Sequence, residues 1–143
     1  MRWLILRTEP AKEQAAARAI AIYGFKTYLP LEIRSHRPSR HTKRRVITET
    51  PLIPRILFAV FPLELLDKIT QQRYIQGIIR GRDEQARPWT ISDEQMTRFQ
   101  EAHQAWLETA TKLHRAGQPG KARKAKWRPI EALREFFTES DTA

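Results

Sequence analysis

Residues 50–61 read Thr-Pro-Leu-Ile-Pro-Arg-Ile-Leu-Phe-Ala-Val-Phe, and this run predicts a buried strand that follows two prolines. Pro51 and Pro54 lack backbone donors and have a restricted φ, which suits the approach to a sheet, whereas residues 55–61 are rich in strand-forming side chains. Alternation along the strand predicts two apolar faces: Ile56, Phe58 and Val60 on one, and Leu57, Ala59 and Phe61 on the other. One face must meet the core, and the other needs a covering helix or a partner.

A strand and a helix are predicted ahead of this run. Residues 2–8 read as a strand with Trp3 and Ile5 on one side and Leu4 and Leu6 on the other. Pro10 suits the first turn of a helix that extends through an alanine-rich stretch and stops at Gly24. Helical spacing assigns an inward stripe of Ala16, Ala19, Ile20 and Tyr23 and an outward group of Lys12, Glu13 and Arg18.

The rest of the chain continues this alternation of strands and helices. Extended segments are expected at residues 25–33, 46–48, 74–80 and 88–91, and a short helix at 62–69. Ser92 and Gln95 form a capping-box signature that begins a long amphipathic helix ending near Gly117. The order of elements predicts an α+β fold, in which helices pack against a mostly antiparallel sheet.

Length and composition limit the class of protein. The 143 residues, 41% of them hydrophobic, suffice for one domain with an appendage. The chain has no cysteine, which excludes disulfides and thiolate metal sites and fits a reducing compartment. No apolar run approaches membrane-spanning length, so a cytoplasmic protein without a membrane partner is expected.

Positive charge is concentrated in two segments that contain no acid. Thirteen of the 26 Lys and Arg residues lie between Glu32 and Glu49 or between Glu108 and Glu131, so the remaining cations are outnumbered by 16 acids. A mildly acidic body with two basic segments indicates a polyanion partner, most often nucleic acid. The alternative is that these segments are solvated loops that aid solubility.

The predicted domain organisation follows from the second basic segment. Residues 1–115 form the folded domain, and residues 116–143 form a basic extension with a hinge at 117–120 and a short helix near 129–137. Between residues 34 and 45, Pro38 is the only apolar residue, so this segment is either the tip of an extended hairpin or a flexible loop.

The ordered motifs resemble the amino-terminal (NGN) domain of the NusG family of transcription elongation factors, most closely the RfaH-type paralogues. The resemblance covers residues 2–105, and its motifs are the strand led by Trp3, the helix with Glu13 and Ala16, the Gly24-Phe25 turn, Pro30, the basic hairpin, the Pro51 to Phe58 run, the Gly77 strand, Pro88 and the helix start at Ile91. It implies an NGN-like fold. Residues 117–143 are too few and too charged for the KOW barrel that most relatives carry.

The resemblance also implies a partner and a site. The partner would be RNA polymerase, bound at the clamp helices of its largest subunit, with an effect on pausing or termination. The polymerase-binding positions fall into two groups. Ile53, Pro54, Ile56 and Phe58 match the pocket that faces the clamp helices, whereas Leu65 and Lys68 fall near the family's contact with the opposite pincer of the polymerase. Ile53 and Ile56 stand where RfaH-type proteins carry aromatic residues.

Nucleic acid is the second expected partner, either the non-template DNA strand or the nascent RNA. The resemblance places Arg7, Lys12, Arg18, Arg73 and Gln76 on the face that meets the non-template strand. The basic segments add Arg37, Arg40, Lys43, Arg44, Arg45, Lys121, Arg123, Lys124 and Lys126.

Other functions remain open at this point. A free-standing RNA- or DNA-binding protein that acts without polymerase would carry the same basic segments, and Ile56 and Phe58 would then be ordinary core residues. An enzyme is not expected, because His36, His41, His103 and His114 lack metal-ligand spacing and form no catalytic constellation. A monomer without metal or cofactor is predicted.

Overall fold

The computed structural model describes residues 2–41, 43–81, 84–118, 121 and 131. The helix expected near 129–137, apart from residue 131, and the cations Arg123, Lys124 and Lys126 lie outside the described residues.

A five-stranded antiparallel sheet forms the body of the molecule. Its order is β2 (Thr27–Tyr28), β5 (Ile56–Ala59), β1 (Trp3–Thr8) and β6 (Ile75–Ile78), while β7 (Thr90–Ile91) pairs with the start of β1. Leu4 lies opposite Ala59 and Arg7 lies opposite Ile56 in the central pair. The α+β prediction with a mostly antiparallel sheet is confirmed.

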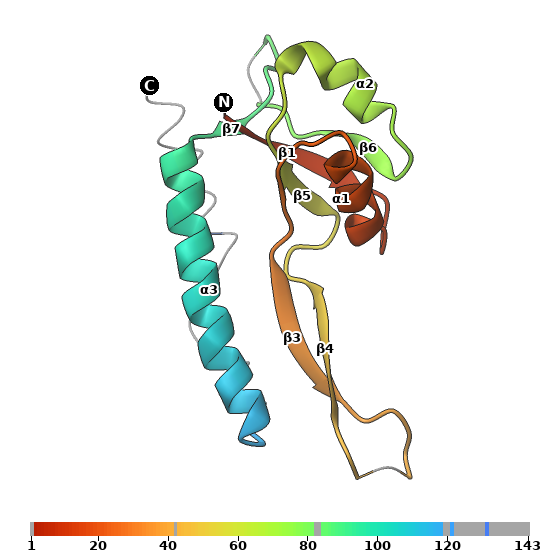
Figure 1. Ribbon diagram of the computed structural model, residues 1–143, viewed down its shortest axis with the longest axis vertical. Coiled ribbons are helices and arrows are strands. Elements are labelled where there is room, and N and C mark those ends of the chain that lie inside the picture. Colours follow the sequence, from red (N-terminus) through yellow and green to blue (C-terminus); the bar gives the residue numbers. More distant parts are fainter. Residues whose placement is uncertain (1, 42, 82–83, 119–120, 122–130, 132–143) are drawn as a thin grey trace.

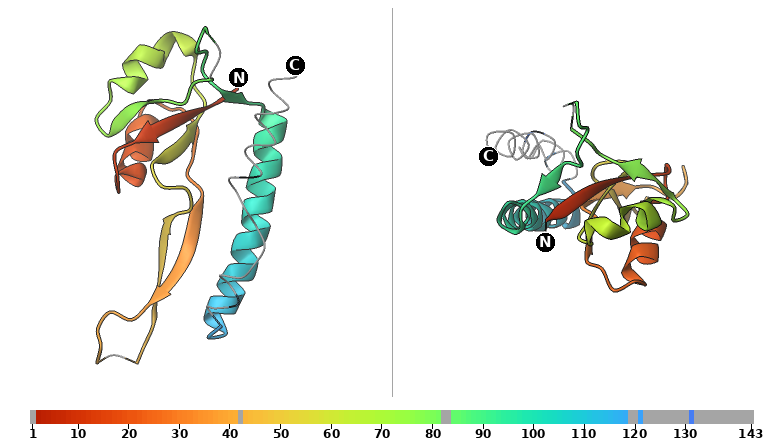
Figure 2. Two further views of the ribbon diagram at one scale, coloured as in Figure 1. Left: turned by 180° about the vertical axis from the view of Figure 1, so that it is seen from behind. Right: turned by 90° about the horizontal axis from the view of Figure 1, so that it is seen from above.

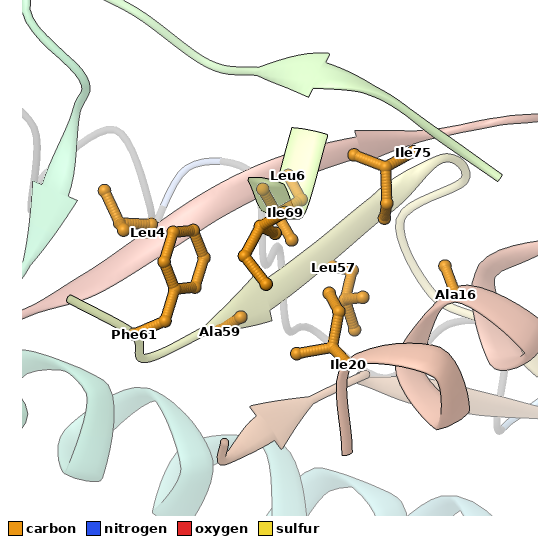
Figure 3. Packing of buried hydrophobic residues seen from close by; sticks show 9 residues of the cluster. All are labelled: Leu4, Leu6, Ala16, Ile20, Leu57, Ala59, Phe61, Ile69 and Ile75. Atoms are coloured by element: carbon orange, nitrogen blue, oxygen red, sulfur yellow. The ribbon is translucent and has the colours of Figure 1, made fainter. Parts of the chain in front are cut away.

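Helices cover the first face of this sheet. α1 (Glu13–Ala21), the 3-10 turn η1 (Leu63–Leu65) and α2 (Leu66–Thr70) pack against the alternate side chains of β1 and β5. Figure 3 shows Leu57 and Ala59 of β5 between Ile20 of α1 and Ile69 of α2. The faces predicted for β1 and β5 are therefore correct.

The second face packs against α3 (Asp93–Arg115), which runs beside the body and continues past it (Figure 1). Trp3, Ile5 and Phe58 from the sheet meet Met96 and Phe99 from the helix. The capping box is present, since Ser92 Oγ accepts from Gln95 N and Gln95 Oε1 accepts from Ser92 N. The helix stops before Gly117, whose φ of 74° suits glycine.

The start of α1 differs from the prediction. The helix begins at Glu13 rather than Pro10, because residues 10–11 form a turn in which Ala11 has a φ of 61°. Glu13 was expected on the outer surface but is only 5% exposed, and Tyr23 was expected inward but is 45% exposed. Glu13 is buried because it has a hydrogen-bond partner across the core, as described below.

A separate two-stranded sheet is formed by β3 (Leu31–His36) and β4 (Val46–Pro51). The register pairs Leu31 with Pro51 and His36 with Val46, so the strands form a regular antiparallel ribbon. This ribbon projects away from the five-stranded sheet (Figures 1 and 2). Of the two alternatives for the basic run, the hairpin is correct.

Candidate functional site

The segment that joins β4 to β5 is held in one conformation by Arg55. This residue has a φ of 67°, which non-glycine residues rarely adopt. Its backbone N–H donates to Glu13 Oε1 at 3.1 Å, and its Nε donates to the carbonyl oxygen of Thr8 at 3.1 Å. A guanidinium N–H also donates to the side chain of Gln76. Arg55 therefore links this segment to α1, β1 and β6.

An apolar edge, defined as Ile53, Pro54 and Ile56, lies on either side of Arg55. Pro54 is exposed, while Ile53 and Ile56 are half-buried and pack against the cluster beneath α3. Arg7 pairs with both Ile56 and Gly77, so its side chain belongs to the same sheet face as Ile56. The apolar edge thus has a neighbouring exposed cation.

Phe58 is a core residue in this structure. It has no exposed surface, and its ring centroid lies 5.8 Å from that of Phe99 on α3. A partner could reach Ile53, Pro54 and Ile56, but not Phe58 while α3 occupies this position.

The other two positions predicted to bind polymerase lie on the opposite side of the sheet. Leu65 packs against the cluster beneath α1 and α2, and Lys68 is exposed with its Nζ 5.8 Å from the centre of the Tyr23 ring. Leu65 and Lys68 therefore lie apart from Ile53, Pro54 and Ile56, which the resemblance assigned to a different polymerase contact.

A second candidate surface surrounds Tyr74 at the start of β6. Lys12 Nζ lies 5.5 Å from the centre of this ring, and Arg73 Cζ lies 4.9 Å from it. Both distances permit cation–π attraction, which brings two cations from separate segments together. Gln76 lies near them in sequence, but its side chain accepts from Arg55.

Two more predicted cations do not join the Tyr74 group. Arg18 is exposed on α1, with no contact that places it at Tyr74, and Arg7 belongs to the face of the apolar edge. Among the described residues, the ion pair found is Arg34 with Glu32, at 2.6 Å. Arg7, Lys12, Arg18 and Arg73 thus have no described carboxylate within ion-pair distance.

The hairpin tip forms a third candidate surface. Its described cations are exposed: Arg37, Arg40, Lys43, Arg44 and Arg45. Arg45 also spans the ribbon, since its Nε donates to Ser35 Oγ at 2.8 Å and its Nη2 to the Ser35 carbonyl at 3.3 Å. Lys121, predicted in the second basic segment, is exposed too.

A buried polar contact joins α3 to the start of the hairpin. His103 Nε2 lies 2.8 Å from the carbonyl oxygen of Leu31, so this nitrogen carries the proton and donates. The other nitrogen, Nδ1, then accepts from the Tyr28 hydroxyl. Burial raises the pKa of Tyr28 to about 12, although a hydrogen bond with Gln104 acts in the opposite direction and lowers this pKa. His103 is thus a buried histidine whose two ring nitrogens both have hydrogen-bond partners.

Sequence reasoning missed the roles of Arg55, Glu13 and Tyr74. The only available signals were that Arg55 interrupts an apolar run and that Tyr74 directly follows Arg73. In the described part of the chain, no group of three or more His, Asp or Glu side chains could hold a metal ion. No helix there is both long and apolar enough to cross a membrane.

Comparison with protein families gives one finding. A family model named NusG, described as transcription termination factor nusG, matches residues 1–100. Comparison with individual curated proteins gives no match.

Proposed function

Since this chain belongs to the NusG family of transcription factors, we propose that it is an elongation or antitermination factor that binds RNA polymerase. It docks on the clamp helices of the largest subunit and contacts nucleic acid through its basic segments. The observation that carries this proposal is the family match over residues 1–100, which spans the whole five-stranded sheet, α1, α2 and the start of α3.

The apolar edge supports the polymerase contact. Ile53, Pro54 and Ile56 present apolar surface at the border of the body, and the Arg55 hydrogen bonds hold them in place without a partner. A preformed surface loses little conformational entropy on binding. Arg7, on the same face, provides a cation for an acidic or polar group on the helix that docks there.

The nucleic-acid contact is supported by the distribution of charge. The cations around Tyr74 and those of the hairpin tip have no described carboxylate partner, so they are available for phosphates. In this proposal the Tyr74 group contacts a single strand, and Gln76 supplies an amide close by.

The polymerase contact can be tested with Ile53→Glu combined with Pro54→Glu. Burial of an apolar side chain is worth about 1.5–3 kcal/mol, so retention of the variant on purified polymerase should fall by about tenfold or more. The readouts are a binding titration on polymerase and a paused-elongation assay.

The matched control is Ile22→Glu combined with Leu63→Glu, because these side chains are 83% and 57% exposed on other parts of the surface. Circular dichroism should show both variants folded. A folded Ile53/Pro54 variant that still bound polymerase as the unchanged protein does would refute the placement. Retention on nucleic acid alone, lost at high salt, with none on polymerase, would favour the free-standing nucleic-acid-binding protein.

A further inference from the structure

The hairpin tip and the carboxyl end of α3, far apart in sequence, lie at the same end of the molecule. The hairpin tip and the carboxyl end of α3 both lie at the end remote from the five-stranded sheet in Figure 1 and in the left view of Figure 2. Contacts between α3 and β3 show that these elements run side by side. We define the basic end as Arg37, Arg40, Lys43, Arg44, Arg45, Lys112 and Arg115.

The charges of the basic end are available for a ligand. All seven side chains belong to exposed residues, and none forms an ion pair with a described carboxylate. The carboxyl end of a helix favours cations, which accounts for part of the preference for Lys112 and Arg115 there. This effect of the helix end does not account for the five cations at the hairpin tip. A concentration of unpaired charge of one sign is the electrostatic pattern of a polyanion-binding surface.

The shape of the hairpin favours a double-stranded ligand. A two-stranded β-ribbon fits the major groove of B-form DNA, which is about 12 Å wide. The hydrogen bonds from Arg45 to Ser35 hold the two strands together next to the tip. Residues 31–51 contain no Phe, Tyr or Trp, whereas proteins that bind single strands use aromatic side chains to stack on bases.

We propose that the basic end binds duplex DNA, with the hairpin tip at a groove and the end of α3 on a neighbouring phosphate backbone. Duplex RNA is a poorer ligand, because its major groove is deep and narrow. This inference rests on the nucleic-acid contact of the proposed function, but it requires no polymerase, so the purified chain can test it alone.

The experiment measures binding of the whole chain to three labelled probes of equal length: duplex DNA, single-stranded DNA and duplex RNA. Fluorescence anisotropy is recorded over a range of KCl concentrations. Duplex DNA should bind most tightly. Its log–log salt slope should reach about −6 if all seven cations contact phosphates, at about −0.9 for each contact. Tighter binding to either other probe would overturn the proposal.

Two variants separate the parts of the basic end. The first variant replaces four tip cations by alanine, Arg37, Arg40, Lys43 and Arg44, and should reduce the magnitude of the salt slope by about 3–4. The second variant combines Lys112→Ala with Arg115→Ala and should reduce the magnitude of the slope by about 2. Arg45 is kept because it bonds to Ser35. The control is Lys26→Ala with Arg87→Ala, two exposed cations outside the proposed surfaces, which should leave the slope unchanged.

The outcomes distinguish this inference from the proposed function. If the α3 variant binds duplex DNA with an unchanged slope, the two elements do not act together and the proposal is wrong. Both variants should keep their salt-resistant retention on polymerase, since neither changes the apolar edge. Loss of polymerase retention with intact DNA binding would contradict only the polymerase part of the proposed function.

Discussion

Arg55 shows how one residue can join several elements. A non-glycine residue in the left-handed region costs about 1 kcal/mol or more. Here the backbone N–H, Nε and a terminal guanidinium N–H each have an acceptor, from Glu13, Thr8 and Gln76 respectively. Hydrogen bonds to charged groups are worth about 1.5–3 kcal/mol, which is enough to offset the strain. Glu13 is buried for the same reason, because it accepts from this residue.

Tyr28 and His103 form the other informative contact at the residue scale. The carbonyl of Leu31 can only accept, so the tautomer of the imidazole that satisfies this contact carries its proton on Nε2. The Tyr28 hydroxyl must then donate to Nδ1. Ionisation of Tyr28 would remove this donor and place a charge at a half-buried position, and both effects oppose ionisation in the folded state.

This contact predicts a pH-dependent loss of stability. The pKa of Tyr28 rises from 10.0 to about 12 on folding, so its contribution is fully present below pH 10 and is lost as the pH rises to about 12. Urea unfolding of the unchanged protein and of Tyr28→Phe should show a difference in free energy that shrinks over this range. A difference that stayed constant between pH 9 and 12, values that bracket the shift, would show that Tyr28 does not titrate in this way.

At the scale of the element, α3 determines which part of the sheet is accessible. Its first half is anchored by the capping box and by a hydrogen bond of 3.1 Å from Trp3 Nε1 to Asp93 Oδ1. Met96 and Phe99 then cover Trp3 and Phe58. The helix therefore hides Phe58 and leaves Ile53, Pro54 and Ile56 as the reachable part of the four positions predicted for the clamp helices.

The packing of α3 predicts the effect of Phe99→Ala. Removal of a buried phenylalanine ring next to Phe58 should lower the free energy of unfolding by about 3–5 kcal/mol. Glu101→Ala, at an exposed position of the same helix, is the control and should change it by less than about 0.5 kcal/mol. Denaturant titration gives both values. A Phe99→Ala loss as small as that of the control would mean that α3 does not rest on Phe58.

On the scale of the whole molecule, the protein consists of a compact body and a projecting ribbon. The body contains both clusters of buried apolar side chains, whereas the described residues of the tip, 37–41 and 43–45, contribute to neither. Val46 and Ile47, at the start of β4, are 37% and 44% exposed. The tip is therefore expected to serve binding rather than stability.

Replacing residues 37–45 by Asn-Gly tests this separation. The two residues suit a type I′ turn between His36 and Val46, which are paired at the end of the ribbon. The thermal midpoint should change by only a few degrees, because no core contact is removed. A collapse of the cooperative transition would show that the tip stabilises the body. Retention of duplex DNA binding would instead contradict the role assigned to the tip.

Much of the fold could be predicted because its signals are local. The two faces of β5, the capping box at Ser92 and the hairpin around residues 34–45 each follow from neighbouring residues in sequence. The first turn of α1 could not be predicted, because Pro10 suits a helix start as well as the turn that it adopts. Helical spacing alone places Glu13 on the outer face of α1. Its burial is explained only by its hydrogen bond with Arg55, 42 residues away.

The sequence by itself determined the class of the fold, the alternation of its strands, the limits of its long helix and the amount of charge in each basic segment. Tertiary structure alone decided that α3 covers Phe58 and that the hairpin tip lies at the same end of the molecule as the carboxyl end of α3. The physical reason is the distance along the sequence over which each property is set. Periodicity, capping and charge are properties of neighbouring residues, whereas accessibility and convergence depend on which elements pack together.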